Sequence, residues 1–401
     1  MRDLAPLIER VLPAATALRH VLHANPELAL EEHATAAAVA ERLRALPGMA
    51  VRTGVGGTGV VAMLDAGRLG PCVLLRADMY ALPLTEATGL PYASRVPGRA
   101  HACGYDGHTA CLVGAATVLA SLGDELPGPV RFVFQPAEEQ KGGGRLVVAD
   151  GALDDPPVAA AFALHAWPGL PIGRIGVRAG PAMAATDGLV ITVRGCGTHA
   201  AAPHRGADPI LAAAHVVTAL QSVVSRTIDP SQPAVLTIAR IEGGTTNNVI
   251  PECVTLGGTL RTITAGTRDA AMAAIRRVAT HAAQALGAEA EVTLNEGYPV
   301  LVNDPAAAAY VAATGRDVLG AGNVHEVAIS LGGEDFAYYL QRVPGALWRL
   351  GVMASGTDEV VPLHSPRFDF PDAALAVGIR LHVELVRRFH AGALASVETA
   401  K

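Results

Sequence analysis

The chain is almost without lysine, and this lack already excludes several kinds of chemistry. Lysine occurs only at positions 141 and 401, so arginine supplies nearly all of the 31 basic residues. A Schiff-base or pyridoxal mechanism would have to use Lys141, the only internal lysine. A phosphate-binding GxxxxGK[ST] loop and a GxSxG nucleophile elbow are also absent. The sequence therefore lacks the motifs that best indicate a phosphate-loop protein or a common serine hydrolase.

Basic clusters, long apolar runs and paired cysteines are missing as well. The formal net charge is −6 and no basic stripe is present, which argues against a nucleic-acid partner. No stretch of eighteen or more residues lacks charged or strongly polar side chains, and the start is charged where a signal peptide needs an apolar segment. The five cysteines are scattered, at positions 72, 103, 111, 196 and 253. We expect a cytoplasmic protein without disulfides or a membrane partner, in which Cys103 is free as a thiolate.

The order of apolar segments predicts an α/β fold. The 401 residues suffice for two or three domains of roughly 150 residues each. Helical spacing predicts helices over 4–22 and 35–46, and a long helix over 371–389. Between them, short apolar strands alternate with helices; the strands are expected at 73–78, 130–134, 160–164 and 346–350. Such alternation is typical of a mostly parallel sheet covered on both faces.

Residues 54–59 match a GxGxxG pattern, but the context does not suit a dinucleotide site. The apolar residues 60–64 that follow look like a strand, whereas a dinucleotide site needs a helix there. We interpret the pattern as a hairpin turn.

After Pro181 the pattern changes to a second domain. The expected elements alternate as strand, helix, strand, strand, helix and strand, over 187–194, 206–226, 234–241, 254–262, 267–286 and 289–294. This is the ferredoxin-like order. The sequence therefore predicts an inserted α+β lid domain over 183–295, between two parts of a catalytic domain, 1–182 and 296–401.

Residues 101–110 are dense in metal-binding side chains. They include Cys103, two histidines, a carboxylate and a phenol beside two glycines that allow sharp turns. The alternative reading is a polar turn before a helix over 110–122. Polar residues at the ends of strands also favour a binding site, because ligands bind beyond the carboxyl ends of strands in open sheets. Asp78, Glu138, Glu139 and His165 occupy such positions.

Several motifs in order resemble one family, the M20 metallopeptidases, in the branch of hippurate hydrolases, N-acyl-amino-acid amidohydrolases and plant auxin-conjugate hydrolases. The matching stretches are Leu-His-Ala-Asn-Pro-Glu-Leu at 22–28, His-Ala-Cys-Gly at 101–104, Gln-Pro-Ala-Glu-Glu at 135–139, His-Ala-Ala-Ala-Pro-His at 199–204, Asn-Val-Ile-Pro-Glu at 248–252 and Gly-Glu-Asp-Phe-Ala at 333–337. The resemblance implies a zinc-peptidase-like catalytic domain, a smaller lid and a two-metal site that hydrolyses an amide.

The resemblance also implies roles for individual residues. Four fall on the family's metal-ligand positions: Cys103, Glu139, His165 and His364. Glu138 falls on the position of the general base, which takes a proton from water, and we expect the two neighbouring glutamates to lie in an irregular loop. In the lid, His199 matches a histidine that reaches a neighbouring subunit's site and stabilises the oxyanion. Asn248 and Arg261 match positions suited to binding the substrate carboxylate, although Arg261 could equally be a surface residue at a strand end.

Two residues depart from the family pattern. Relatives usually have His at position 105, a metal ligand, and Asp at position 80, whereas this chain has Tyr105 and Tyr80. A phenol has a pKa of about 10 and must lose its proton to bind a metal ion, so Tyr105 should weaken one metal position.

Our leading hypothesis is a metal-dependent amidohydrolase that cleaves N-acyl amino acids or similar small amides. Zinc suits a ligand set of cysteine, histidine and glutamate, while manganese, cobalt and nickel stay open, at one or two ions per chain. We expect a homodimer or homotetramer, because the lid's edge strands must be paired, covered or blunted. The alternative, motivated by Tyr80 and Tyr105, is a family member that no longer hydrolyses: a binding protein or an amide-forming enzyme.

Overall fold

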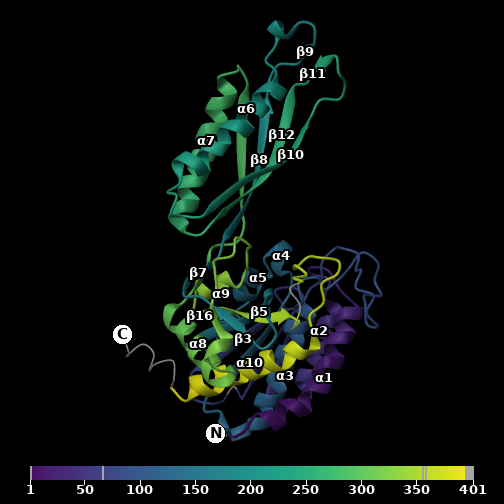
Figure 1. Ribbon diagram of the computed structural model, residues 1–401, viewed down its shortest axis with the longest axis vertical. Coiled ribbons are helices and arrows are strands. Elements are labelled where there is room, and N and C mark those ends of the chain that lie inside the picture. The colour runs from purple at the N-terminus through teal and green to yellow at the C-terminus, as the bar shows by residue number, and fades with distance from the viewer. Residues whose placement is uncertain (1, 66, 355, 357–358, 393–401) are drawn as a thin grey trace. The chain divides into compact units, whose positions relative to one another are not determined.

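Two units, each with its own hydrophobic core, make up the chain (Figure 1). A computed structural model describes residues 2–65, 67–354, 356 and 359–392. Unit 1 is drawn from Met1–Gly180, Val302–Ala328 and Asp335–Lys401, and unit 2 from Pro181–Leu301 and Ile329–Glu334. The chain thus passes from unit 1 into unit 2 and back. The role of unit 2 as a lid stays a prediction.

The sheet of unit 1 has eight strands in the order β1-β2-β4-β3-β5-β16-β6-β15. Their bounds are β1 Met49–Val55, β2 Gly59–Leu64, β3 Cys72–Asp78, β4 Val130–Gln135, β5 Val158–Pro171, β6 Ile175–Val177, β15 Val324–Glu326 and β16 Gly345–Met353. The central strands β4, β3, β5 and β16 all run parallel to one another. The antiparallel pair of β1 and β2 confirms the predicted hairpin at 54–59. Because the central strands are buried on both faces, they carry the continuous apolar runs seen in the sequence.

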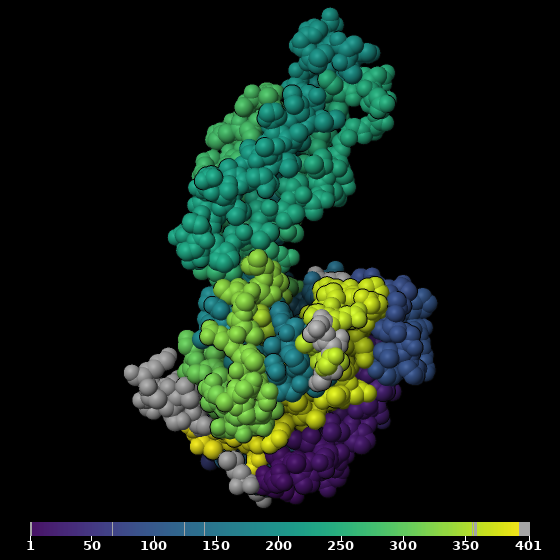
Figure 2. Space-filling view, in the orientation of Figure 1, coloured from purple at the N-terminus to yellow at the C-terminus, as the bar shows by residue number. Residues whose placement is uncertain are grey.

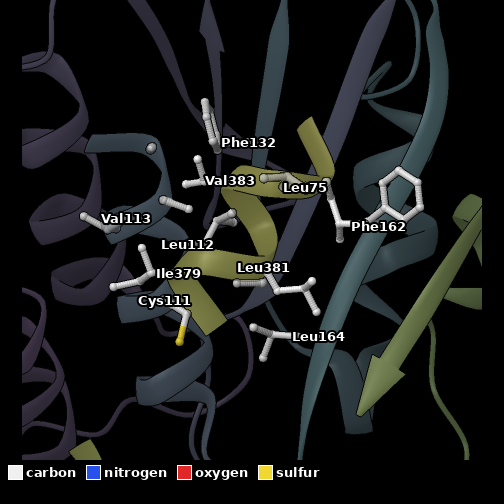
Figure 3. Close-up of a cluster of buried hydrophobic side chains, with 14 of the residues drawn as sticks. Leu75, Cys111, Leu112, Val113, Phe132, Phe162, Leu164, Ile379, Leu381 and Val383 are labelled. Atoms are coloured by element: carbon white, nitrogen blue, oxygen red, sulfur yellow. The ribbon is translucent and has the colours of Figure 1, made fainter. Parts of the chain in front are cut away.

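Helices cover both faces of this sheet. On one face, α1 (Ala5–Ala24), α3 (Tyr105–Leu122) and α10 (Leu375–His390) pack together, with α2 (His33–Arg44) and α8 (Pro305–Leu319) beside them. The short helices α5 (Gly143–Ala149) and α9 (Ala337–Leu340) lie on the other face. Leu75, Phe132 and Phe162 of the strands meet Leu112 of α3 and Ile379 of α10 in the main core (Figure 3).

Residues from both ends of the chain build unit 1. Figure 2 shows α1, in purple, beside the yellow C-terminal segment on one face of this unit, and α1 packs against α10. The expected helices over 4–22 and 371–389 are therefore confirmed.

Unit 2 contains a four-stranded antiparallel sheet in the order β10-β12-β8-β13. The helices α6 (Pro209–Ser222) and α7 (Ala265–Gln284) pack together on one face of it. The strand bounds are β8 Ala185–Arg194, β10 Ala234–Gly243, β12 Cys253–Thr262 and β13 Glu289–Glu296, with the short strands β7 Gly180–Met183, β9 Thr198–His199, β11 Val249–Ile250 and β14 Leu301–Asn303 elsewhere. The main elements follow the predicted ferredoxin-like order.

Among the described helices, one segment is long and apolar enough to cross a membrane. It is Pro209–Thr227, which comprises α6 and the π-helical turn after it, and its hydropathy is 1.2. Ala212, Val216 and Leu220 on this helix are buried in the core of unit 2. Packing in this core accounts for only part of its apolar character, because Ile210 is 48% and Leu211 is 50% exposed.

Three local predictions are wrong. The helix expected from residue 110 begins at Tyr105, because Gly104 takes a left-handed φ of 84° that ends the loop there. β5 continues to Pro171, since it pairs with β16 over its length, so His165 lies within the strand and not at its end. Glu138 and Glu139 open a short helix, α4 (Glu138–Lys141), and do not lie in an irregular loop.

Candidate metal centre

Three side chains of the types that bind transition metals lie together in unit 1. The Cys103 Sγ, a carboxylate oxygen of Glu139 and a ring nitrogen of His364 all lie within 4.8 Å of one another. They come from separate segments: the loop before α3, the first turn of α4 and the loop before α10. The fold thus brings together three of the four residues expected to bind metal.

His165, the fourth expected ligand, lies beside this group on β5. Its Nε2 is 3.8 Å from Cys103 Sγ, and its Nδ1 is 2.8 Å from the carbonyl oxygen of Ala166. A carbonyl only accepts, so Nδ1 carries the hydrogen and Nε2 keeps its lone pair. Burial and the neighbouring His108 lower the pKa of His165 to about 4. The ring is therefore neutral, which is the form that binds a metal ion.

His364 is held through its backbone. Its amide donates to the carbonyl oxygen of Ala102 at 2.8 Å, and its φ of 64° lies in the left-handed region, which costs a non-glycine residue about 1–2 kcal/mol. The His364 Nε2 is 3.1 Å from Glu139 Oε1, and this hydrogen bond raises the pKa of His364. Although burial opposes it, hydrogen bonds from His364 and Tyr105 lower the pKa of Glu139. Glu139 is therefore a carboxylate.

Tyr105 lies between the two glutamates. Its hydroxyl is 2.8 Å from Glu138 Oε2 and 3.0 Å from Glu139 Oε1, and it donates to these oxygens. Burial and the negative charges around it raise the pKa of this phenol well above its ordinary value. Tyr80 packs against it with ring centroids 5.2 Å apart, and the Tyr80 hydroxyl oxygen accepts the Glu139 amide at 2.7 Å. Both tyrosines thus bind the segment that carries the glutamates.

Glu138, the predicted base, is buried and shares only some of its partners with Glu139. Its Oε1 accepts the backbone amide of Asp335 at 3.3 Å, while Oε2 accepts the Tyr105 hydroxyl. The turn that presents α4 is tight, because a Cβ on Gly143 would lie 1.7 Å from the Pro136 carbonyl oxygen. The two neighbouring carboxylates therefore differ in their surroundings: Glu139 is one of the three clustered donors, whereas Glu138 accepts the Asp335 amide.

The start of α3 depends on a contact that the sequence did not indicate. A Cβ on Gly107 would lie 2.2 Å from the ring of Phe370, so glycine is needed there for the helix to pack on this ring. Phe370 is fully buried. An apolar residue far along the chain carries no local signal of its partner, and only the glycine itself hinted at a close approach.

His108 and Asp78 support the ligands and do not join them. Asp78 follows a strand as expected, but its carboxylate is 2.6 Å from His108 Nδ1 and 2.9 Å from an Arg76 nitrogen. His108 Nε2 accepts the backbone amide of Ala166 at 2.8 Å. His108 therefore ties α3 to β3 and β5, next to His165. Although burial opposes it, Arg76 and His108 lower the pKa of Asp78, so it is ionised.

A buried charge network includes His23, from the stretch at 22–28 that resembles the family. Arg19 lies 3.1 Å from Asp106 and 2.9 Å from Asp369, and His23 Nδ1 lies 2.9 Å from Asp106. Although burial opposes it, Asp106 and Glu86 raise the pKa of His23 to about 9. Charged residues of α1 thus anchor Asp106, the residue after Tyr105.

The expected substrate-binding residues lie in unit 2, at two different places. His199 of β9 pairs with Val249 of β11, and the Ala200 amide donates to the Asn248 carbonyl oxygen at 3.0 Å, so His199 and Asn248 are neighbours. Both are exposed, beside a groove of about 450 Å³ that His199 helps to line. Arg261 lies near the C-terminal end of β12, whereas Cys253 begins this strand. At roughly 3.3 Å per residue these eight steps span about 26 Å, so Asn248 and Arg261 do not meet within one chain.

The donor set suits one transition-metal ion. Cysteine sulfur, imidazole nitrogen and a carboxylate oxygen are the ligands that zinc prefers, and four such donors complete a tetrahedral site. Burial raises the pKa of the Cys103 thiol well above its ordinary value. Cys103 is free of a disulfide as predicted, but without metal its sulfur is a thiol and not a thiolate, and it must release its proton as an ion binds.

The chain is similar to known proteins over most of its length. Residues 74–388 match the peptidase family M20/M25/M40. An N-acetyl-L-cysteine deacetylase of Bacillus subtilis is 40% identical over 360 residues, which cover 89% of this chain and 84% of the relative. A plant relative, the IAA-amino acid hydrolase ILR1-like 4 of Arabidopsis thaliana, is 38% identical over 376 residues. These residues cover 93% of this chain and 84% of the relative.

A solved structure is similar as well. It is a Bacillus subtilis protein described as a dinuclear metal-binding peptidase from the M20 family, with a TM-score of 0.82 and 34% identity over 96% of this chain and 99% of its own.

Proposed function

The chain belongs to the peptidase family M20/M25/M40 and is a metal-dependent amidohydrolase, and we propose that it releases the acyl group from N-acyl amino acids or similar small amides. The observation that carries the proposal is the convergence of Cys103, Glu139 and His364 beside the separately held Glu138. We further place it in the cytoplasm.

Cys103, Glu139, His364 and His165 would hold the metal ion, which we take to be zinc. When bound, the ion supplies a Lewis acid that polarises the scissile carbonyl and acidifies water. The remaining steps fall to the chain's own residues. Glu138 is not among the three clustered donors, and each of its oxygens already accepts one hydrogen bond. These donors fix its orientation, so that it can take the proton from attacking water and deliver it to the leaving amine.

The residues of unit 2 fit a site completed by a second copy of the chain. His199 would stabilise the oxyanion, and Asn248 and Arg261 would bind the substrate carboxylate. Because Asn248 and Arg261 lie at opposite ends of β12, both can reach one substrate only if they come from different copies. This supports a homodimer or homotetramer.

The neighbouring glutamates provide a matched test of the assignment. Glu138→Gln should lower the turnover of N-acetylcysteine and other N-acyl amino acids by roughly 10²–10⁴-fold while bound metal is kept, because only the base is lost. Glu139→Gln should lose metal and activity together. Amine release and metal content would be measured on both purified variants. Turnover of Glu138→Gln at the parent rate would show that another group is the base.

The rival function is binding, or amide formation, without hydrolysis. It is favoured by the hydrogen bonds that Tyr105 makes to both glutamates. Metal analysis separates the two functions. Less than one ion per chain after growth in metal-rich medium, with no loss of function on chelation, would support the rival.

A further inference from the structure

Tyr80 and Tyr105 form a rigid pair in the middle of the metal centre. Tyr80 is 0% and Tyr105 is 1% exposed, and both pack in a small cluster with Leu82, Ala102 and Cys103. Since each ring is buried against the other and both hydroxyls are hydrogen-bonded, neither can turn away without losing contacts. The pair is therefore part of the site's architecture.

The Tyr105 hydroxyl lies between the two glutamates, in the space that a cation bound to the same two oxygens would need. It is within hydrogen-bond distance of one oxygen from each carboxylate. A cation held by these oxygens would need the phenol to leave or to give up its proton. The Tyr80 hydroxyl, at the backbone amide of Glu139, fixes this segment from another side.

The four expected ligands are enough for one ion, and the second buried group of carboxylates, which includes Glu138 and Asp335, is already held by other donors. Cys103, Glu139 and His364 are clustered, and His165 Nε2 is 3.8 Å from the Cys103 sulfur. A catalytic ion usually takes three protein ligands, so two ions need about six ligand positions, even if some are shared. Glu138 is engaged by Tyr105 and the Asp335 amide. The similar Bacillus subtilis structure is described as dinuclear.

We infer that this chain is a mononuclear member of its family, in which the Tyr105 hydroxyl takes the place of a second metal ion and holds Glu138 and Glu139 by hydrogen bonds. The ion is bound by Cys103, Glu139, His364 and His165. Tyr105 is a positioning residue, because it acts on the substrate only through the glutamates. The inference rests on the proposed metal-dependent function.

Metal stoichiometry tests the inference without any substrate. The full-length protein would be stripped with a chelator, reloaded with Mn²⁺ or Zn²⁺, freed of excess ion by gel filtration and analysed by mass spectrometry. The wild type and Tyr105→Phe should each bind one ion per chain, because the phenol is not a ligand. Tyr105→His, or the double variant with Tyr80→Asp, should bind two. Tyr80→Phe is the matched control and should stay at one.

Electron paramagnetic resonance of the Mn²⁺ forms adds a second readout. The wild type should give the hyperfine pattern of an isolated ion, and the histidine variant the broadened signal of a coupled pair. Circular dichroism confirms that each variant is folded.

Four results would overturn the inference: two ions, or none, in the wild type; loss of the ion in Tyr105→Phe; or a single ion in both histidine variants. A wild type without any ion would also count against the proposed metal-dependent function, whereas the other three outcomes are independent of it. A dinuclear wild type that hydrolyses N-acyl amino acids refutes only the mononuclear site. A mononuclear wild type that hydrolyses no N-acyl amino acid refutes only the proposed substrate class.

Discussion

Among single residues, His382 on α10 couples stability to pH without taking part in the site. It is fully buried, its ring lies edge-on to Trp348 at a centroid distance of 5.5 Å, and neither ring nitrogen has a hydrogen-bond partner among the described residues. Burial lowers the pKa of His382 to about 3 from the ordinary 6.5.

This shift predicts a loss of stability in acid. Between pH 6.5 and about 3 the unfolded chain binds a proton at His382 that the folded chain does not. The free energy of unfolding should therefore decrease as the pH is lowered through this range. His382 contributes up to about 1.4 kcal/mol per pH unit to this decrease. His382→Leu removes the effect, so its stability should change less between pH 7 and pH 4 in urea denaturation. An equal change in variant and wild type would contradict the assignment.

The ligand types of the site could be predicted from the sequence, but their partners could not. The family resemblance predicted Cys103, Glu139 and His364 as metal ligands, and their donor atoms do lie within 4.8 Å of one another. The bond from Tyr105 to both glutamates joins residues more than thirty positions apart and depends on where α4 turns. A substitution at position 105 indicated weakened metal binding, whereas the geometry indicates a hydrogen-bond donor.

At the level of elements, the start of α3 is held by side-chain contacts to several other segments of unit 1. It carries Tyr105, Asp106 and His108, whose partners lie on three other segments. The spacing of apolar residues predicted most helices and strands, because each helix buries one apolar stripe and each central strand is buried on both faces. It placed the start of α3 five residues late, since polar residues buried by tertiary contacts look like a loop in sequence.

Gly107 and Phe370 should show strong coupling. Gly107→Ala places a methyl group 2.2–2.5 Å from the Phe370 ring, and we expect it to destabilise the protein by about 3 kcal/mol or more. In a Phe370→Leu background the same change should cost markedly less. Urea denaturation of the four proteins in this cycle measures the coupling. Equal costs in both backgrounds would mean that the clash is relieved elsewhere.

At the level of the whole molecule, the edge strands of unit 2 offer a surface for the proposed association. Its sheet ends in the edge strands β10 and β13, and on β10 Val235 is 37% and Ile241 is 61% exposed. Exposed apolar edges promote pairing with another chain. The antiparallel order of this sheet was predictable from the alternation of its elements, but which edge pairs depends on exposure that only the folded chain reveals.

Complementation tests whether a second copy completes the site. Glu138→Gln and His199→Ala should each be inactive alone. If His199 acts in the partner's site, a mixed dimer contains one site with both native residues. Random co-assembly should then restore roughly a quarter of wild-type activity, because half of the dimers are mixed. No recovery in mixed dimers verified by sedimentation would place His199 in its own chain's site, or outside catalysis.

Because lysine is scarce, Lys141 allows labelling or cleavage at a single internal position. It ends α4, two residues after Glu139, and its side chain is exposed. Because the only other lysine is residue 401, an amine-directed reagent or a lysine-specific protease has a single internal target. That target lies on the segment that presents both glutamates. Cleavage or labelling at one native residue can thus follow local opening of the catalytic segment, without an engineered probe.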